Sequence, residues 1–136
     1  MFVLDASVAI SWFFQDEASG EKELSLLEKL KRGWAVVPGI WPLEVSNVLL
    51  VALRRGRVGP SGVYRVMELL SRLPIEVEDI SLDLAFKAIY PVAREYELSI
   101  YDASYLELAV RKGLPLATKD ADLKKAARRA NIQLLV

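Results

Sequence analysis

The sequence contains no cysteine and no histidine among its 136 residues. Without cysteine there are no disulfides and no thiol nucleophiles, and without histidine there is no imidazole base. The nitrogen and sulfur ligands that structural zinc sites use are missing as well. Any chemistry of this chain therefore depends on carboxylates, hydroxyls, amines or a metal ion bound by oxygen.

The sequence also lacks an excess of charge of either sign, because 18 basic residues balance 18 acidic residues. No overall positive field attracts a polyanion, so contact with nucleic acid would depend on local groups of basic residues. The longest uncharged apolar run, residues 33–43, is too short to cross a bilayer and includes two prolines and two glycines. No signal-peptide pattern is present. We expect a cytoplasmic protein without membrane contact.

Short apolar runs alternate with amphipathic segments along the chain. We predict strands at 2–4, 35–38, 75–79, 114–118 and 132–136, and helices over 7–14, 21–32, 42–55, 61–72, 82–96, 100–112 and 120–129. Pro91 predicts a break or kink in the helix over 82–96. Continuous apolar strands separated by helices favour a mainly parallel sheet. We therefore expect one α/β domain, residues 1–136, with a central sheet of about five strands and helices on both faces.

Four acidic residues lie at the ends of these predicted elements. Asp5 directly follows the first strand, and Asp120 follows the fourth strand after one intervening residue. If Pro42 is the first residue of its helix, Glu44 takes the third position, and Asp102 takes the third position after a capping serine. Sites in parallel α/β sheets form beyond the carboxyl ends of the strands. We expect all four carboxylates at that rim of the sheet.

Two explanations are open for each of the four. Asp5 and Asp120 are suitable N-caps, and Glu44 would favour the positive end of a helix dipole. Ser99 with Asp102 matches a capping box. Alternatively the four share a divalent cation, because carboxylates gathered in one place repel one another and raise one another's pKa unless a cation offsets their charge. A set of oxygen ligands without histidine suits Mg²⁺ or Mn²⁺.

Four short segments carry a family resemblance: VLDASV (3–8), PLEVSNVL (42–49), YDASYLELA (101–109) and LATKDADL (116–123). In this order and rough spacing they resemble the four acidic motifs of PIN domains. The compact length and the opening VLDASV are most similar to the VapC toxins of type II toxin–antitoxin pairs. The resemblance covers almost the entire chain and implies a PIN-like fold and metal-dependent endoribonuclease activity.

The resemblance implies an acidic quartet that is both catalytic and metal-binding, with Mg²⁺ or Mn²⁺ as the cofactor: Asp5, Glu44, Asp102 and Asp120. Thr118 would be the hydroxyl residue beside the last acid, and Asn47 the polar residue one helical turn after the glutamate. Asp122 either assists or replaces Asp120, although the T-x-D spacing favours Asp120, or is a solvated acid in the first turn of a helix.

The reaction that the resemblance implies is hydrolysis of RNA phosphodiester bonds by a water that the carboxylate-bound metal activates. The implied partners are an RNA substrate, a cognate antitoxin protein and a second copy of the chain in a homodimer. Lys119, Lys124 and Lys125 lie near the last acid and are candidates for phosphate contact. The apolar group Trp12, Phe13, Phe14, Trp41 and Leu43 belongs either to the core or to a partner-binding surface.

Other functions on a similar sheet fit the sequence less well. A phosphatase of the haloacid dehalogenase type would need an aspartate two residues after Asp5, where Ser7 stands. A response-regulator receiver would need an acidic pair at the first strand. The remaining alternative is a catalytically silent PIN-like module that binds RNA or serves as a scaffold, because retained ligands do not prove turnover. Metal-dependent RNA cleavage separates the two.

Overall fold

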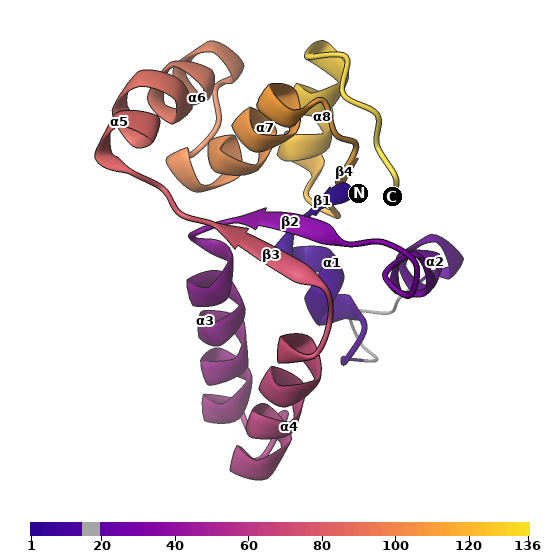
Figure 1. Ribbon diagram of the computed structural model, residues 1–136. Coiled ribbons are helices and arrows are strands. Elements are labelled where there is room, and N and C mark those ends of the chain that lie inside the picture. Colours follow the sequence, from indigo (N-terminus) through magenta and orange to yellow (C-terminus); the bar gives the residue numbers. More distant parts are fainter. Residues whose placement is uncertain (15–19) are drawn as a thin grey trace.

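The computed structural model describes residues 1–14 and 20–136, and its centre is a parallel sheet (Figure 1). The strands are β1 (Phe2–Leu4), β2 (Ala35–Pro38), β3 (Ile75–Glu78) and β4 (Leu116–Ala117), in the order β3-β2-β1-β4. Every residue of β1, β2 and β4 is buried, whereas the edge strand β3 is partly exposed. The continuous apolar runs of the sequence therefore predicted the parallel sheet correctly.

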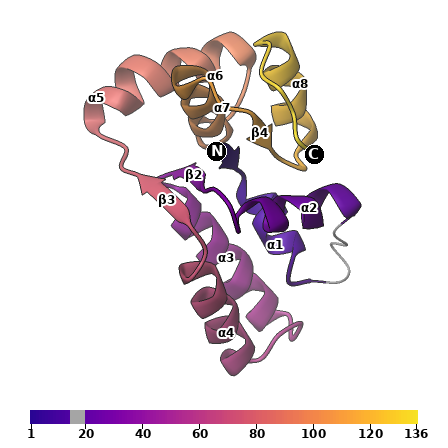
Figure 2. The ribbon, with the colours of Figure 1, turned by 45° about the vertical axis from the view of Figure 1, so that its right-hand side comes forward.

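Helices cover both faces of this sheet, as the sequence predicted (Figures 1 and 2). On one side lie α1 (Ala6–Ser11), α2 (Glu21–Lys29), α3 (Trp41–Arg54) and α4 (Pro60–Ser71), and on the other α5 (Leu82–Leu84), the π-helix η2 (Ala85–Ile89), α6 (Tyr90–Tyr96), α7 (Ile100–Lys112) and α8 (Ala121–Arg129). Helix α7 packs on β1, β2 and β4, and its residues 103–109 are all buried. No helix in the described ranges is both long and apolar enough to cross a membrane.

The sheet has four strands rather than the expected five. The C-terminal segment 132–136 forms one parallel bridge, from Leu134 to Leu116, and not a full strand. Two backbone hydrogen bonds accompany the bridge, from Leu116 N–H to Gln133 and from Leu135 N–H to Leu116. Because β4 itself has only two residues, it offers the last segment too little backbone for a longer ladder.

The expected break in the helix over 82–96 lies just before Pro91. The turn from Ala85 to Ile89 is a π-helix, and α6 begins at Tyr90 with Pro91 in its first turn. Proline has no N–H, and its ring clashes with the carbonyl four residues earlier. A wider π turn in front of the proline relieves that clash while the chain keeps its helical direction.

Helix ends follow the capping residues of the sequence with one shift. Ser99 accepts a hydrogen bond from the N–H of Asp102 at 3.1 Å, and Gly113 ends α7 with a φ of +64°. Helix α3 begins at Trp41, so Pro42 is its second residue and Glu44 its fourth, not the first and third as expected. The shift arises because the carbonyl of Ile40 already accepts the N–H of Glu44 at 3.0 Å.

Most of the apolar group formed by Trp12, Phe13, Phe14, Trp41 and Leu43 belongs to the core. Trp41 is buried, and Trp12, Phe13 and Phe14 pack against the main core as partly buried side chains. Only Leu43 points to solvent, with 66% of its surface exposed. Core packing therefore explains four of these five side chains, and no extended partner surface is needed for them.

Candidate active site

The ends of β1 and β4 place Asp5 beside Thr118. The two strands are parallel neighbours with Leu4 paired to Ala117, so the next residue of each strand stands in the same row. The N–H of Asp5 donates to the carbonyl of Ala117 at 2.9 Å, which continues the ladder. The fully buried Thr118 hydroxyl then donates to Oδ2 of Asp5 at 2.6 Å. Strand register thus joins two residues that are 113 positions apart.

A second hydroxyl holds the same carboxylate. Ser7 Oγ donates to Oδ2 of Asp5 at 2.8 Å and accepts the N–H of Lys119 at 3.1 Å. Asp5 occupies the N-cap position of α1, yet its side chain makes no capping hydrogen bond. The capping explanation is therefore wrong for Asp5, whose carboxylate is instead fixed by two hydroxyl groups.

Asp120 does cap its helix. Its Oδ2 accepts the N–H of Leu123 at 2.8 Å at the start of α8, and its own N–H donates to Thr118 Oγ1 at 3.0 Å. Thr118 therefore bridges Asp5 and Asp120, donating to one and accepting from the other. Asp122 is exposed in the first turn of α8.

Glu44 and Tyr105 connect α3 to α7. The Tyr105 hydroxyl donates to Oε1 of Glu44 at 2.5 Å, and the tyrosine is completely buried. Burial and the nearby charges of Asp5 and Glu44 raise the pKa of Tyr105, so its hydroxyl keeps the proton that it donates. Asn47 is exposed one turn after Glu44, and the hydrogen bond on the glutamate comes from Tyr105 instead.

Asp102 is the third residue of α7 and is partly buried beside other carboxylates. Burial, and after it the charges of Asp120, Asp5 and Asp122, raises its pKa to about 6, while the hydrogen bond with Ser99 opposes the rise. One half of the expected capping box of Ser99 and Asp102 is present, because the Ser99 hydroxyl accepts the N–H of Asp102 and so caps the helix. The cap does not offset the cost of placing this carboxylate next to the others.

Electrostatic coupling extends across the predicted quartet. Burial raises the pKa of Asp5, and the charge of Asp120 adds to the effect, although the hydroxyls of Thr118 and Ser7 oppose it. Burial also raises the pKa of Glu44, with further contributions from Asp5 and Asp102 against the Tyr105 hydrogen bond. The fold therefore brings the four carboxylates, which come from four separate segments, within electrostatic range of one another.

The chemistry of this donor set fits a hard divalent cation, although the side chains do not yet converge on one point. Among residues 1–14 and 20–136, no group of three acidic side chains is arranged to hold a metal ion as it stands. The Tyr105 hydroxyl engages one oxygen of Glu44, and the N–H of Leu123 engages one oxygen of Asp120. The other oxygen of each carboxylate keeps lone pairs for a metal.

Ser7 and Tyr105 are the contacts that sequence reasoning missed. Ser7 stands two residues after Asp5, and this spacing lets its hydroxyl reach back to that carboxylate. Tyr105 stands three residues after Asp102 on the same face of α7, which was the available signal. Its partner Glu44 is 61 residues away, and no local pattern identifies such a pair.

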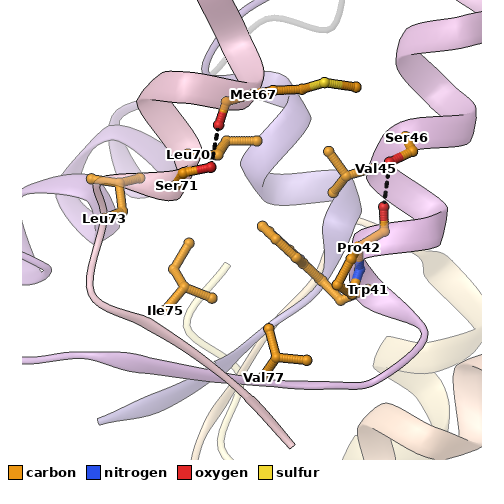
Figure 3. A pocket seen from close by; sticks show the side chains of 10 residues that line it. All are labelled: Trp41, Pro42, Val45, Ser46, Met67, Leu70, Ser71, Leu73, Ile75 and Val77. Atoms are coloured by element: carbon orange, nitrogen blue, oxygen red, sulfur yellow. Dashed lines mark hydrogen bonds between the residues drawn. The ribbon is translucent and has the colours of Figure 1, made fainter. Parts of the chain in front are cut away.

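A separate apolar pocket of about 270 Å³ lies between α3, α4 and β3 (Figure 3). Trp41, Val45 and Leu70 are among the side chains that line it, together with Ile75 and Val77 from the edge strand. No charged residue lines this pocket. It therefore lacks groups for hydrolysis, and the carboxylate rim remains the candidate active site.

Comparison with solved structures finds the same fold in several proteins. PAE2754 from Pyrobaculum aerophilum has a TM-score of 0.71 and 25% identity, covering 98% of this chain and 83% of that one. A toxin–antitoxin complex from Klebsiella pneumoniae has a TM-score of 0.63 and 22% identity, with coverage of 88% and 87%. VapC20 from Mycobacterium tuberculosis, described as a sarcin–ricin loop cleaving toxin, has a TM-score of 0.62 and 19% identity, with coverage of 93% and 95%.

These likenesses establish the fold, and the last two are too distant in sequence to establish more. A search of curated proteins finds no match. The family model described as PIN domain matches residues 2–129, which is nearly the whole chain. The four-stranded parallel sheet with helices on both faces agrees with that match. This chain belongs to the PIN domain family.

Proposed function

We propose that this protein is a metal-dependent endoribonuclease and the toxin of a toxin–antitoxin pair. The observation that carries the proposal is the gathering of Asp5, Glu44 and Asp102, whose pKa values are all raised by burial and by neighbouring carboxylates. Acidic groups that are gathered in one place with raised pKa values are typical of a functional site, and a positive ligand would relieve their mutual repulsion.

The ligand proposed for this site is Mg²⁺ or Mn²⁺, held by Asp5, Glu44, Asp102 and Asp120. When bound, such an ion supplies a Lewis acid that offsets the charge developing on a phosphodiester and makes water more acidic. The chain's own groups prepare the site. Ser7 and Thr118 fix the carboxylate of Asp5, and the helix cap fixes that of Asp120.

RNA is the proposed substrate. VapC20, which shares the fold, is described as cleaving the sarcin–ricin loop. The absence of histidine excludes a mechanism in which two imidazoles exchange the protons of the RNA 2′-hydroxyl. Lys119 stands between Thr118 and Asp120, and Lys124 and Lys125 follow on α8, so positive charge lies beside the acids where phosphates would approach.

The proposed protein partners are an antitoxin and a second copy of this chain. One structure with the same fold is a toxin–antitoxin complex, which supports the first of these. Large apolar side chains exposed along the helix over 82–96 support protein contact as well, namely Leu82, Phe86 and Tyr90 with exposures of 69%, 66% and 55%. Light scattering of the purified chain measures whether it forms the homodimer.

The function is tested by incubating total RNA with the purified protein in Mg²⁺ or Mn²⁺, and again with a chelator. Asp5→Asn is the matched variant, because asparagine keeps an oxygen that accepts from Ser7 and Thr118. We expect metal-dependent cleavage by the wild type, no cleavage by Asp5→Asn, and a metal-induced rise in melting temperature for the wild type alone.

Two other outcomes have definite meanings. Metal binding by the wild type without cleavage of any RNA would favour the catalytically silent module. Neither cleavage nor a metal-induced rise in melting temperature would refute the metal site altogether.

A further inference from the structure

We infer that Tyr105 is a positioning residue for Glu44 and sets the affinity of the acidic site for its metal. The inference rests on the proposed function, since it treats Glu44 as a ligand. Tyr105 itself is not a ligand in this view. Its hydroxyl acts through the carboxylate to which it donates, at a distance of 2.5 Å.

The two partners differ in burial and in the number of rotamers open to them, and this difference decides which side chain orients the other. Tyr105 is completely enclosed, so packing fixes its ring and therefore its hydroxyl. Glu44 is only partly buried in the first turns of α3, and a glutamate has several rotamers to lose when it is fixed. A rigid donor thus selects the orientation of a flexible acceptor, and not the reverse.

The same helix supplies a proposed ligand and the positioning group. Asp102 and Tyr105 are three residues apart in α7 and lie on one face of the helix. Through Tyr105, the glutamate of α3 is tied to the helix that carries Asp102, although the two elements are far apart in sequence. Because the hydrogen bond engages Oε1, lone pairs on Oε2 remain for a cation.

A buried tyrosine also needs a hydrogen-bond partner for its own sake, so a purely structural role is the competing explanation. The two roles differ in what Tyr105→Phe changes. A structural role predicts lower stability and unchanged metal affinity. A positioning role predicts weaker metal binding even when the folded protein is intact, because outer partners of metal ligands commonly contribute about 10- to 100-fold in affinity.

The test measures the Mn²⁺ dissociation constant of the full chain, from the electron paramagnetic resonance signal of free Mn²⁺. Tyr101→Phe is the matched control, because Tyr101 lies four residues earlier in α7 and is 60% exposed. We expect Tyr105→Phe to raise the dissociation constant about 10-fold or more and Tyr101→Phe to leave it unchanged. In a Glu44→Gln background, Tyr105→Phe should have no further effect, because its target carboxylate is gone.

An unchanged dissociation constant for Tyr105→Phe would overturn the inference, and so would an effect that persists in full in the Glu44→Gln background. If Tyr105→Phe is partly unfolded in buffer, the titration is repeated in sucrose, which favours the folded chain, under the same criteria. A wild type that binds no Mn²⁺ would remove the proposed function and this inference together. A wild type that binds Mn²⁺, with Asp5→Asn failing to bind and Tyr105→Phe unchanged, would remove the inference alone.

Discussion

The two ends of α7 hold acidic side chains in opposite electrostatic surroundings. At the N-terminal end, Asp102 has Asp5 and Asp120 as charged neighbours, and its pKa is raised to about 6. At the C-terminal end, Glu107 is more deeply buried, yet Arg111 donates to both of its oxygens, at 2.8 and 3.1 Å. Arg111 also pairs with Glu78 of β3, whose pKa it lowers.

The two ends of α7 therefore differ in how the charges of their acidic side chains are balanced. Cationic side chains pair with the acids where α7 meets the edge strand, as Arg111 and Lys112 do with the partly exposed Glu78. At the other end, burial and neighbouring carboxylates raise the pKa values of Asp5 and Glu44, which has a cost in folding free energy. The proposed divalent cation would offset this cost on binding and so stabilise the folded chain.

The substitution with the largest expected effect changes only the acidic, N-terminal end of α7. We expect Asp102→Asn to lower RNA cleavage by about 100-fold or more, since loss of a partner outside the metal shell already costs about 10- to 100-fold. The melting temperature in chelator should stay equal or rise, because one of the repelling charges is removed. Cleavage assays and melting curves of the same preparation check both parts.

The matched control is Glu107→Gln, which changes the same chemical group at the other end of the same helix. It should lower the melting temperature and leave cleavage within about 2-fold of wild type, as for a change far from the site. If Asp102→Asn were instead the variant that loses its fold, the result would favour a capping role for Asp102 at the start of α7.

The next largest effect is expected at the C-terminal end of α7, where Arg111 pairs with Glu107. Arg111→Met should lower the free energy of unfolding by about 2 kcal/mol, because Glu107 keeps a buried charge without its partner. Lys87→Met is the control, since Lys87 and Asp83 form a pair on the surface with exposures of 78% and 79% at 3.7 Å. Urea denaturation should show no more than about 0.5 kcal/mol for that variant. Equal losses would mean that burial does not distinguish the two pairs.

A third prediction sharpens the comparison through pH. The raised pKa of Asp102 means that the folded, metal-free protein takes up a proton near pH 6 and the unfolded chain only near 3.8. Stability from this group is therefore fully present below the lower value and is lost as the pH rises through the higher one. Lowering the pH from about 7 to about 5 should stabilise the protein in chelator by about 1 kcal/mol, with allowance for solvent screening.

At the C-terminal end of α7, where Arg111 pairs with Glu78, the dependence of stability on pH has the opposite sign. Because Arg111 lowers the pKa of Glu78 below its ordinary 4.5, that contact stabilises the fold above this pH and is lost on further acidification. Melting temperature in chelator should thus rise from pH 7 to 5 and fall again in stronger acid. Asp102→Asn should reduce the rise from pH 7 to 5 without abolishing it, because the raised pKa values of Asp5 and Glu44 act with the same sign. The fall in stronger acid should not change. An equally large rise in melting temperature from pH 7 to 5 in that variant would show that groups other than Asp102 produce it.

The smallest effect concerns the choice between two neighbouring acids. Asp122→Asn should change cleavage by no more than about 2-fold, because Asp122 is exposed in the first turn of α8. Asp120→Asn should lower cleavage strongly and still fold, since asparagine also accepts the N–H of Leu123 as an N-cap. The reverse order of effects would make Asp122 the fourth ligand.

Local patterns predicted much of the fold. The cap at Ser99, the stop at Gly113 and the break before Pro91 all depend on neighbours in sequence, and each was correct to within a few residues. Local sequence patterns predicted element bounds less well where a backbone hydrogen-bond partner decides them, as at the start of α3 and in the C-terminal segment. The placement of the acids at strand and helix ends was also visible, but the alternatives of cap and ligand stayed open.

What the sequence determined by itself is the kind of chemistry. The absence of cysteine and histidine, together with four acids in family order, restricts the site to oxygen ligands. Only the tertiary structure decided which groups hold those acids, because the sheet order β3-β2-β1-β4 brings Thr118 to Asp5 and the packing of α7 brings Tyr105 to Glu44. Such contacts join residues 113 and 61 positions apart, and they exist only once the strands have paired and the helices have packed.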